Sequence, residues 1–266
     1  MTPISGDPCS FVTSVGGGKI ILVSRSGVAL VYDTPTLTSL PTLMVPRQEL
    51  ALADLTGDWN ALGFERDDAT VPFVPTRIKF TLGADGKFQA GADCTGVDNC
   101  EAWQPNELPV LTVNPRGGFT LTDSNGTSAL VAFKDIDGTV MAVITHGNGL
   151  IVATKQVVRP LPAVGKKNAF WDIAVFGALN YVYAKDETEI KSVDNSTNIY
   201  TRERASDKRI DTYVQNQPNA GLRYRPKDSG SNAREAVSMV VGNTGLSFLI
   251  SLDQTSLFYD IAVDRP

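Results

Sequence analysis

The chain has 266 residues, of which 42% are hydrophobic and 20% are charged, and its formal net charge is −5 at pH 7. This composition is typical of a globular protein and excludes a disordered or fibrous chain. No apolar run approaches the roughly 18 residues that a membrane-spanning helix requires, so we expect no transmembrane segment. The length is sufficient for two domains of ordinary size.

The negative charge is concentrated in the middle of the sequence. Residues 42–162 contain nine Lys and Arg against fourteen Asp and Glu, whereas residues 163–266 contain thirteen of each. Nucleic acids and anionic membrane surfaces are bound by clustered Lys and Arg, so the acidic middle section argues against both. We therefore expect no nucleic-acid partner.

The first 41 residues predict a tail followed by a hairpin. Pro3, Gly6 and Pro8 interrupt regular structure in residues 1–9, and a short strand is expected at residues 10–15. Residues 18–41 begin with Gly, pass through an apolar strand, a polar turn and a second apolar strand, and end with Pro. These residues resemble the closing part of a repeat whose opening part is absent, so either the sequence is a piece of a larger protein or the hairpin completes a neighbouring barrel. We therefore interpret residues 1–41 as a tail and a hairpin from a partial repeat.

Residues 42–162 predict a complete β-unit. After a connector with one short helical candidate at residues 48–54, Trp59 begins a strand. Residues 77–82 alternate apolar and polar, and Asp85-Gly86 is a strong signal for a two-residue hairpin turn. Further strands are expected at residues 110–113, 118–122 and 129–133. A second copy of the hairpin, residues 138–162, closes the unit.

Residues 163–266 repeat this order, with Trp171 in the place of Trp59 and a third hairpin copy at residues 245–266. Trp59 lies 79 residues before Gly138, and Trp171 lies 74 residues before Gly245. This near-constant spacing indicates internal repetition. We predict an all-β fold with two tandem antiparallel β-barrel-like repeats, at residues 42–162 and 163–266, because closure of a barrel removes exposed strand edges.

The segment Gly57-Asp-Trp59, at the first strand of the middle section, resembles the opening of lipocalins, of the wider calycin group and of avidin-like barrels. The third section departs from this pattern, since Ala169 stands where the motif has glycine. The resemblance implies an up-and-down barrel in which the tryptophan plugs one end. It therefore implies structural roles, not chemical ones, for Trp59 and Trp171.

The cysteines predict one local disulfide. Cys94 and Cys100 flank a five-residue loop, and pairing is favoured over metal binding because no third ligand accompanies them. Cys9 is then buried, free or paired elsewhere. It lacks the Leu-led pattern of a lipid-attached cysteine, so a lipoprotein signal would have to precede this sequence. Strands rich in Thr, Ser and Asn also favour an extracytoplasmic location, in the periplasm, the envelope or the medium, with a signal sequence removed.

The remaining polar motifs predict turns and not chemistry. His146 is the single histidine, which argues against His-rich zinc and catalytic sites, and its position at a hairpin tip indicates an exposed residue. Asp135-Ile-Asp137-Gly138 fits a turn better than a calcium loop, because the rest of the calcium-loop pattern is missing. We assign no catalytic residue, metal site or cofactor.

The densest charged stretch is residues 202–209, which lies between Tyr200 and Tyr213. Basic residues among aromatic ones can bind single-stranded nucleic acid, but Glu203 and Asp207 offset the charge here. We expect a solvated hairpin face or a contact between the repeats. An anionic partner, such as a polysaccharide or a phospholipid headgroup, is the alternative.

The absence of recognised catalytic motifs favours a non-enzymatic envelope or secreted protein with a ligand-binding or structural role. The expected partner is a small apolar ligand or an envelope component. One alternative is a glycoside hydrolase that uses paired carboxylates of the acidic middle repeat, where Asp67-Asp68 is a tight acidic pair. Another is a rigid spacer in a larger envelope protein. Barrels of about eight strands are either filled by side chains or hold one small ligand, so the lining of each interior decides between these functions.

Overall fold

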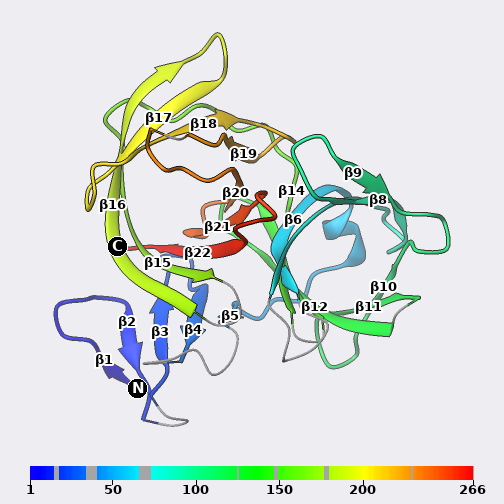
Figure 1. Cartoon of the computed structure of the whole chain (residues 1–266). Coiled ribbons are helices and arrows are strands. Elements are labelled where there is room, and N and C mark those ends of the chain that lie inside the picture. The colour runs from blue at the N-terminus through cyan, green and yellow to red at the C-terminus, as the bar shows by residue number, and fades with distance from the viewer. Residues whose placement is uncertain are drawn as a thin grey trace.

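The computed structural model describes residues 1–14, 18–33, 41–65, 73–124, 126–146, 149–176, 180–228 and 230–265. Regular structure in these residues is almost entirely β-strand, arranged in three sheets (Figure 1). The predicted all-β fold is confirmed. Within the described residues the one helical element is η1, a 3-10 turn at Leu52–Leu55 that overlaps the predicted short helix.

The N-terminal sheet has five antiparallel strands in sequence order. They are β1 (Thr2–Pro3), β2 (Ser10–Val12), β3 (Ile20–Val23), β4 (Ala29–Tyr32) and β5 (Thr42–Met44). The predicted hairpin is the β3–β4 pair. Residues 1–9 are not the free tail that we expected, because β1 pairs with β2 and the side chain of Asp7 is buried.

The middle section folds into a curled nine-stranded antiparallel sheet, the first barrel, in which β14 pairs with β6. Its strands are β6 (Gly57–Glu65), β7 (Val74–Leu82), β8 (Phe88–Cys94), β9 (Cys100–Ala102), β10 (Val110–Val113), β11 (Phe119–Asp123), β12 (Gly126–Lys134), β13 (Val140–His146) and β14 (Gly149–Lys155). Strands β9 and β10 are its edges. A bridge between Val110 of β10 and Lys87, the residue before β8, links the two sides of the sheet, but β9 and β10 do not pair with each other.

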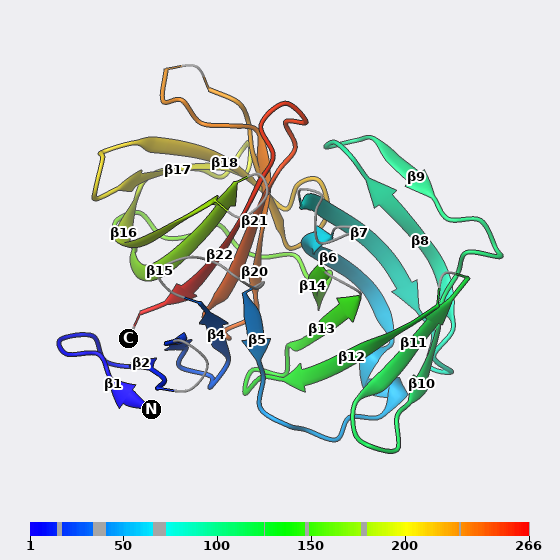
Figure 2. The same cartoon turned by 60° about the horizontal axis from the view of Figure 1, so that its bottom comes forward.

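The last section is a closed eight-stranded barrel, the second barrel, in which β15 pairs with β22. Its strands are β15 (Lys167–Phe176), β16 (Asn180–Asp194), β17 (Ile199–Arg204), β18 (Ile210–Gln215), β19 (Leu222–Arg225), β20 (Ala236–Val241), β21 (Leu246–Ser251) and β22 (Phe258–Asp264). The two barrels lie side by side, with the N-terminal sheet against the second one (Figure 2).

The three predicted hairpin copies correspond to β3–β4, β13–β14 and β21–β22. The glycines that open them have positive φ angles: +89° at Gly18, +85° at Gly138 and +75° at Gly245. Only glycine adopts this backbone conformation without strain, which accounts for its presence at all three turns. In both units the last strand pairs with the tryptophan-bearing strand, but only the second is a closed barrel, because the first stays open between β9 and β10.

One apolar core joins the three sheets. It contains Leu22 and Leu30 of the N-terminal sheet together with side chains from the outer faces of both barrels. At its centre the ring of Phe64, from β6, stacks on that of Tyr259, from β22, with centroids 3.8 Å apart. A second apolar core fills the inside of the first barrel, around Trp59 and Phe80.

Candidate functional site

The two tryptophans point to opposite sides of their barrels. Trp59 lies inside the first barrel, stacks on Phe80 with centroids 5.9 Å apart, and donates a hydrogen bond from Nε1 to the carbonyl of Leu55 at 2.8 Å. Trp171 is completely buried, but it packs in the core outside the second barrel, and its Nε1 donates to the carboxylate of Asp7. Trp171 is therefore not a plug of its own barrel. Its neighbour Phe170 faces the interior instead.

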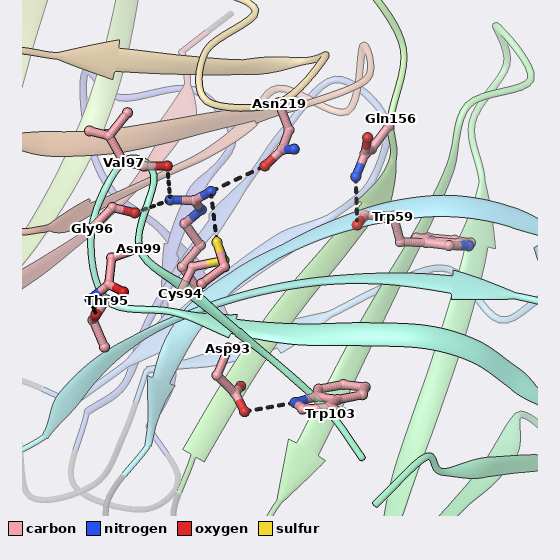
Figure 3. The surroundings of a disulfide bond; sticks show 12 residues. Trp59, Asp93, Cys94, Thr95, Gly96, Val97, Asn99, Trp103, Gln156 and Asn219 are labelled. Atoms are coloured by element: carbon pink, nitrogen blue, oxygen red, sulfur yellow. Dashed lines mark hydrogen bonds between the residues drawn. A yellow bond between two sulfur atoms is a disulfide. The ribbon is translucent and has the colours of Figure 1, made fainter. Parts of the chain in front are cut away.

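Cys94 and Cys100 form a disulfide with an S–S distance of 2.07 Å between β8 and β9 (Figure 3). Cys9 is free and exposed. The loop inside the disulfide carries the carbonyls of Gly96 and Val97, both of which accept hydrogen bonds from Arg77. The disulfide thus sits beside a buried guanidinium group.

The carboxylates of Asp135 and Asp137 both accept hydrogen bonds from backbone amides of their turn. Asp135 accepts a hydrogen bond from the amide of Ile136 at 2.7 Å, and Asp137 accepts one from the amide of Thr139 at 2.8 Å. No group of three metal-ligating side chains occurs among the described residues. His146 ends β13 and its side chain lies outside the described part of the chain, as does the pair Asp67-Asp68.

The interior of the second barrel is polar, in contrast to that of the first. Even-numbered residues of β15 and β22, among them Asp172 and Asp260, line a cavity of about 650 Å³. The odd-numbered residues Ile173 and Ile261 point outward into the shared apolar core. Ligand-binding cavities commonly measure roughly 300–1,000 Å³, so this chamber can hold a small molecule.

Two arginines and two tyrosines form a compact cluster on the wall of this chamber. The rings of Tyr200 and Tyr213 stack with centroids 5.4 Å apart, and the guanidinium of Arg202 lies 4.7 Å from the centre of the Tyr213 ring. Arg202 also donates to the hydroxyl of Tyr213 at 2.7 Å, and Arg223 donates to the hydroxyl of Ser238 at 2.5 Å. The Nε atoms of both arginines are buried without a hydrogen-bond partner in the described residues.

A charged layer separates this chamber from a smaller one of about 320 Å³ at the other end of the barrel. The residues that line both chambers are Asp172, Arg204, Arg209, Arg225, Leu249 and Asp260. Within the layer Asp211 is the main counter-charge, with its oxygens 3.0 Å from Arg209 and 3.9 Å from Arg202 and Arg225. Part of the arginine charge is therefore neutralised inside the barrel wall.

Asp172 and Asp260 are neighbours on β15 and β22 in this layer. Burial raises the pKa of the Asp172 carboxyl well above its ordinary value, and the negative charge of Asp260 raises it further. Burial also raises the pKa of Asp260, although nearby arginines, among them Arg225 and Arg202, oppose this rise. Two adjacent buried carboxyls cannot both ionise without cost, so the pair keeps a proton more readily than isolated aspartates do.

The larger chamber has an excess of positive charge. Nine of its lining residues are Lys or Arg and three are Asp. Four of these cations, Arg25, Arg159, Lys166 and Arg223, have no carboxylate within 4.0 Å among the described residues. Burial lowers the pKa of Arg159, and the positive charge of Arg223 lowers it further. An anion in this chamber would relieve that repulsion.

Residues outside the second barrel also line the chamber. Arg25 comes from the turn of the N-terminal hairpin, and Arg159 comes from the linker between the barrels. The stretch 202–209 is not simply a solvated face, because Arg202 and Arg204 point into the barrel. The alternation of Tyr200, Arg202 and Arg204 was the signal for this site. It did not identify the interior, because alternation alone does not say which face of a strand is enclosed.

No protein-family model matches this chain, and no curated protein matches it. Among solved structures, a protein of unknown function from the DUF3598 family of Nostoc punctiforme PCC 73102 is similar at 8% sequence identity, with a TM-score of 0.28. The match covers 80% of this chain and 97% of that one. Within the described residues no helix has both the length and the hydropathy needed to cross a membrane.

Proposed function

We propose that this protein is a non-enzymatic binding protein whose second barrel holds a small anionic ligand. The observation that carries the proposal is the lining of the larger chamber, where nine basic residues outnumber three acidic ones. A buried cation without a counter-charge is unfavourable, and an anionic ligand with several oxygens supplies both the charge and the acceptors. Small-molecule sites are typically concave and contain a few convergent polar groups, as this chamber does.

The same lining argues for an anionic ligand in place of the small apolar one expected for a barrel of this class. Arg202, Arg223 and Asp264 all contribute charged groups to the chamber wall, and these would have to be desolvated against an apolar molecule. The buried cluster inside the first barrel, around Trp59 and Phe80, consists by contrast of apolar side chains. The hydrolase alternative, which relied on carboxylates of the middle section, gains no support from that interior.

We also propose an extracytoplasmic location, on the basis of the Cys94–Cys100 disulfide. Disulfides form and persist mainly in oxidising compartments, whereas most cytosolic thiols are kept reduced. Fractionation of the native host, followed by thiol labelling with and without reduction, tests this. Recovery of the protein in the cytoplasmic fraction with both thiols reactive would contradict it.

Calorimetric titration with citrate at low ionic strength tests the ligand class. We expect citrate to bind the full chain, binding to weaken as salt is added, and Arg223→Gln to weaken it roughly tenfold or more, since a charged hydrogen bond is lost. The matched control is Arg116→Gln, at an exposed turn of the first barrel, which should leave binding unchanged. The neutral apolar dye N-phenyl-1-naphthylamine provides the opposing arm. Binding of the dye without binding of citrate would overturn the proposal, as would citrate binding that is indifferent to Arg223→Gln.

A further inference from the structure

The loop between β18 and β19, residues Asn216–Gly221, is held by the first barrel. Arg77, on β7, donates from Nη2 to the side-chain oxygen of Asn219 at 3.2 Å, a bond drawn in Figure 3. Asn60, on β6, donates from its side chain to the carbonyl of Ala220 at 2.8 Å. Both donors are buried residues on the outer face of the first barrel. The first barrel therefore fixes a loop that belongs to the second.

The same loop fixes the backbone of Arg159 at the chamber. The side-chain oxygen of Asn216 accepts a hydrogen bond from the amide of Arg159 at 2.9 Å, and its side-chain nitrogen donates to the carbonyl of Arg159 at 2.9 Å. That oxygen also accepts from the amide of Gly221 at 3.1 Å, which ties the end of the loop to its beginning. The side chain of Arg159 lines the larger chamber. A displacement of the loop thus moves a cation of the candidate site.

Arg77 is itself tightly held but has no salt-bridge partner. It is 3% exposed, and its Nη1 donates to the carbonyls of Gly96 and Val97 in the disulfide loop. No carboxylate lies within 4.0 Å of it among the described residues, and burial lowers its pKa to about 10. An apolar side chain would avoid the cost of burying this charge. The guanidinium bridges the two barrels, because Nη1 is bonded to the disulfide loop of the first barrel while Nη2 reaches Asn219 of the second.

We propose that Arg77 is a positioning residue for the anion site of the second barrel, and that it acts on Arg159 through Asn219 and Asn216. The predicted effect on ligand affinity rests on the proposed function, whereas the hydrogen bonds that connect Arg77 to Arg159 do not depend on it. It assigns the first barrel a role in binding even though the ligand never contacts it. Affinity for an anion then depends on the contact between the barrels as well as on the residues of the chamber.

A double-mutant cycle on the full chain tests this. We expect Arg77→Lys, which keeps the charge but loses the planar fork of donors, to weaken citrate binding roughly three- to tenfold. In an Arg159→Ala background the same substitution should have almost no effect, because the residue through which it acts is gone. A merely structural role would give additive losses. Additivity, or an Arg77→Lys variant with wild-type affinity, would overturn the inference.

Hydrogen exchange provides a readout that needs no ligand. The amides of Arg159 and Gly221 both donate to Asn216, so we expect both to exchange faster in Arg77→Lys and in Asn60→Ala. The amide of Thr188, in the β15–β16 ladder, should keep its protection. If the wild-type protein does not bind citrate but the amide of Arg159 still exchanges faster in both variants, the proposed function is wrong, and the inference that Arg77 positions Arg159 still holds. Unchanged Arg159 exchange in both variants overturns the positioning.

Discussion

The carboxylate of Asp7 accepts hydrogen bonds from the indole Nε1 of Trp171 at 3.1 and 3.2 Å, across 164 positions of the sequence. Lys185 lies 2.6 Å from the same carboxylate, and the Asp7 side chain is only 2% exposed. Burial alone would raise the pKa of Asp7, but the hydrogen bonds from Lys185 and Trp171 outweigh it and hold this pKa below its ordinary value. The N-terminal segment is therefore docked on the outside of the second barrel.

We predict that Asp7→Ala lowers the free energy of unfolding by about 1–3 kcal/mol at pH 7, because it leaves a buried indole N–H without an acceptor. A carboxyl with a lowered folded-state pKa stabilises above the unfolded-state value, and this contribution is lost as the pH falls through the folded-state pKa. The difference between wild type and Asp7→Ala should therefore shrink below about pH 4. Urea unfolding at pH 7 and at pH 3 measures it. An equal difference at both pH values would contradict the assigned role.

The Asp172–Asp260 pair should produce the opposite dependence on pH. A carboxyl whose folded-state pKa is raised keeps its proton in the native state while the unfolded chain releases it, so stability falls as the pH rises above the unfolded-state value. We predict that Asp172→Asn, which cannot ionise, is more stable than wild type at pH 7 and shows a flatter stability profile between pH 4 and 7. The substitution should lower the slope of the unfolding free energy against pH by at most about 1.4 kcal/mol per pH unit, the limit for one proton.

Thermal or urea unfolding across that pH range measures the profile of the variant. Asp85→Asn is the control, because Asp85 lies in an exposed turn and carries a lowered pKa, set chiefly by a backbone hydrogen bond from Lys87. Its substitution should not flatten the profile. An Asp172→Asn profile parallel to that of wild type would show that the pair is ionised in the folded protein.

The strands and turns were predictable because their signals are local. The alternation of apolar and polar residues located β7, Asp85-Gly86 marked a turn, and the glycines at 18, 138 and 245 marked the repeated hairpins through a conformation that favours glycine. The near-constant spacing between each tryptophan and its hairpin likewise reflects the pairing of the last strand with the tryptophan-bearing strand in both units. None of these signals depends on how the sheets pack together.

The sequence did not predict that Trp171 lies outside its barrel or that the barrel interior is polar. Alternation of apolar and polar residues defines the two faces of a strand, but it does not say which face the barrel encloses. On β15 the more apolar face, with Trp171 and Ile173, packs against other parts of the chain, and the opposite face, with Asp172, lines the cavity. A lone barrel would place its apolar face inside. Here the neighbouring sheets cover the outside, so the usual rule is reversed.

The close contact at Gly91 offers a test of how Trp103 packs on β8. A Cβ added to this residue would lie 1.8 Å from Cε3 of Trp103, whose amide donates to the carbonyl of Gly91 at 2.9 Å. Trp103 also donates from Nε1 to Asp93 at 2.7 Å. We predict that Gly91→Ala expels the Trp103 ring into solvent and costs about 1–2 kcal/mol, from the lost hydrogen bond and the lost packing on Phe88.

Fluorescence reports this change, because Trp59 and Trp171 are buried and only Trp103 is partly exposed. The emission of Gly91→Ala should shift to longer wavelength and be quenched more readily by iodide. Ala90→Ser, at the exposed neighbouring position, is the matched control and should leave the spectrum unchanged. A wild-type spectrum for Gly91→Ala would mean that the ring does not lie over this strand.

The Cys94–Cys100 disulfide closes a short loop, so its effect on stability should be modest and separable from that of Cys9. Cross-linking two residues this close in sequence restricts the unfolded chain by about 2 kcal/mol. We predict that the double variant Cys94→Ser/Cys100→Ser loses about this much, and that adding a dithiol reductant to the wild-type protein produces the same loss. Cys9→Ser should unfold like wild type, since Cys9 is exposed and unpaired. A larger loss in the double variant would indicate that the carbonyls of Gly96 and Val97 no longer hold Arg77, and hydrogen exchange at the loop 216–221 would then rise with it.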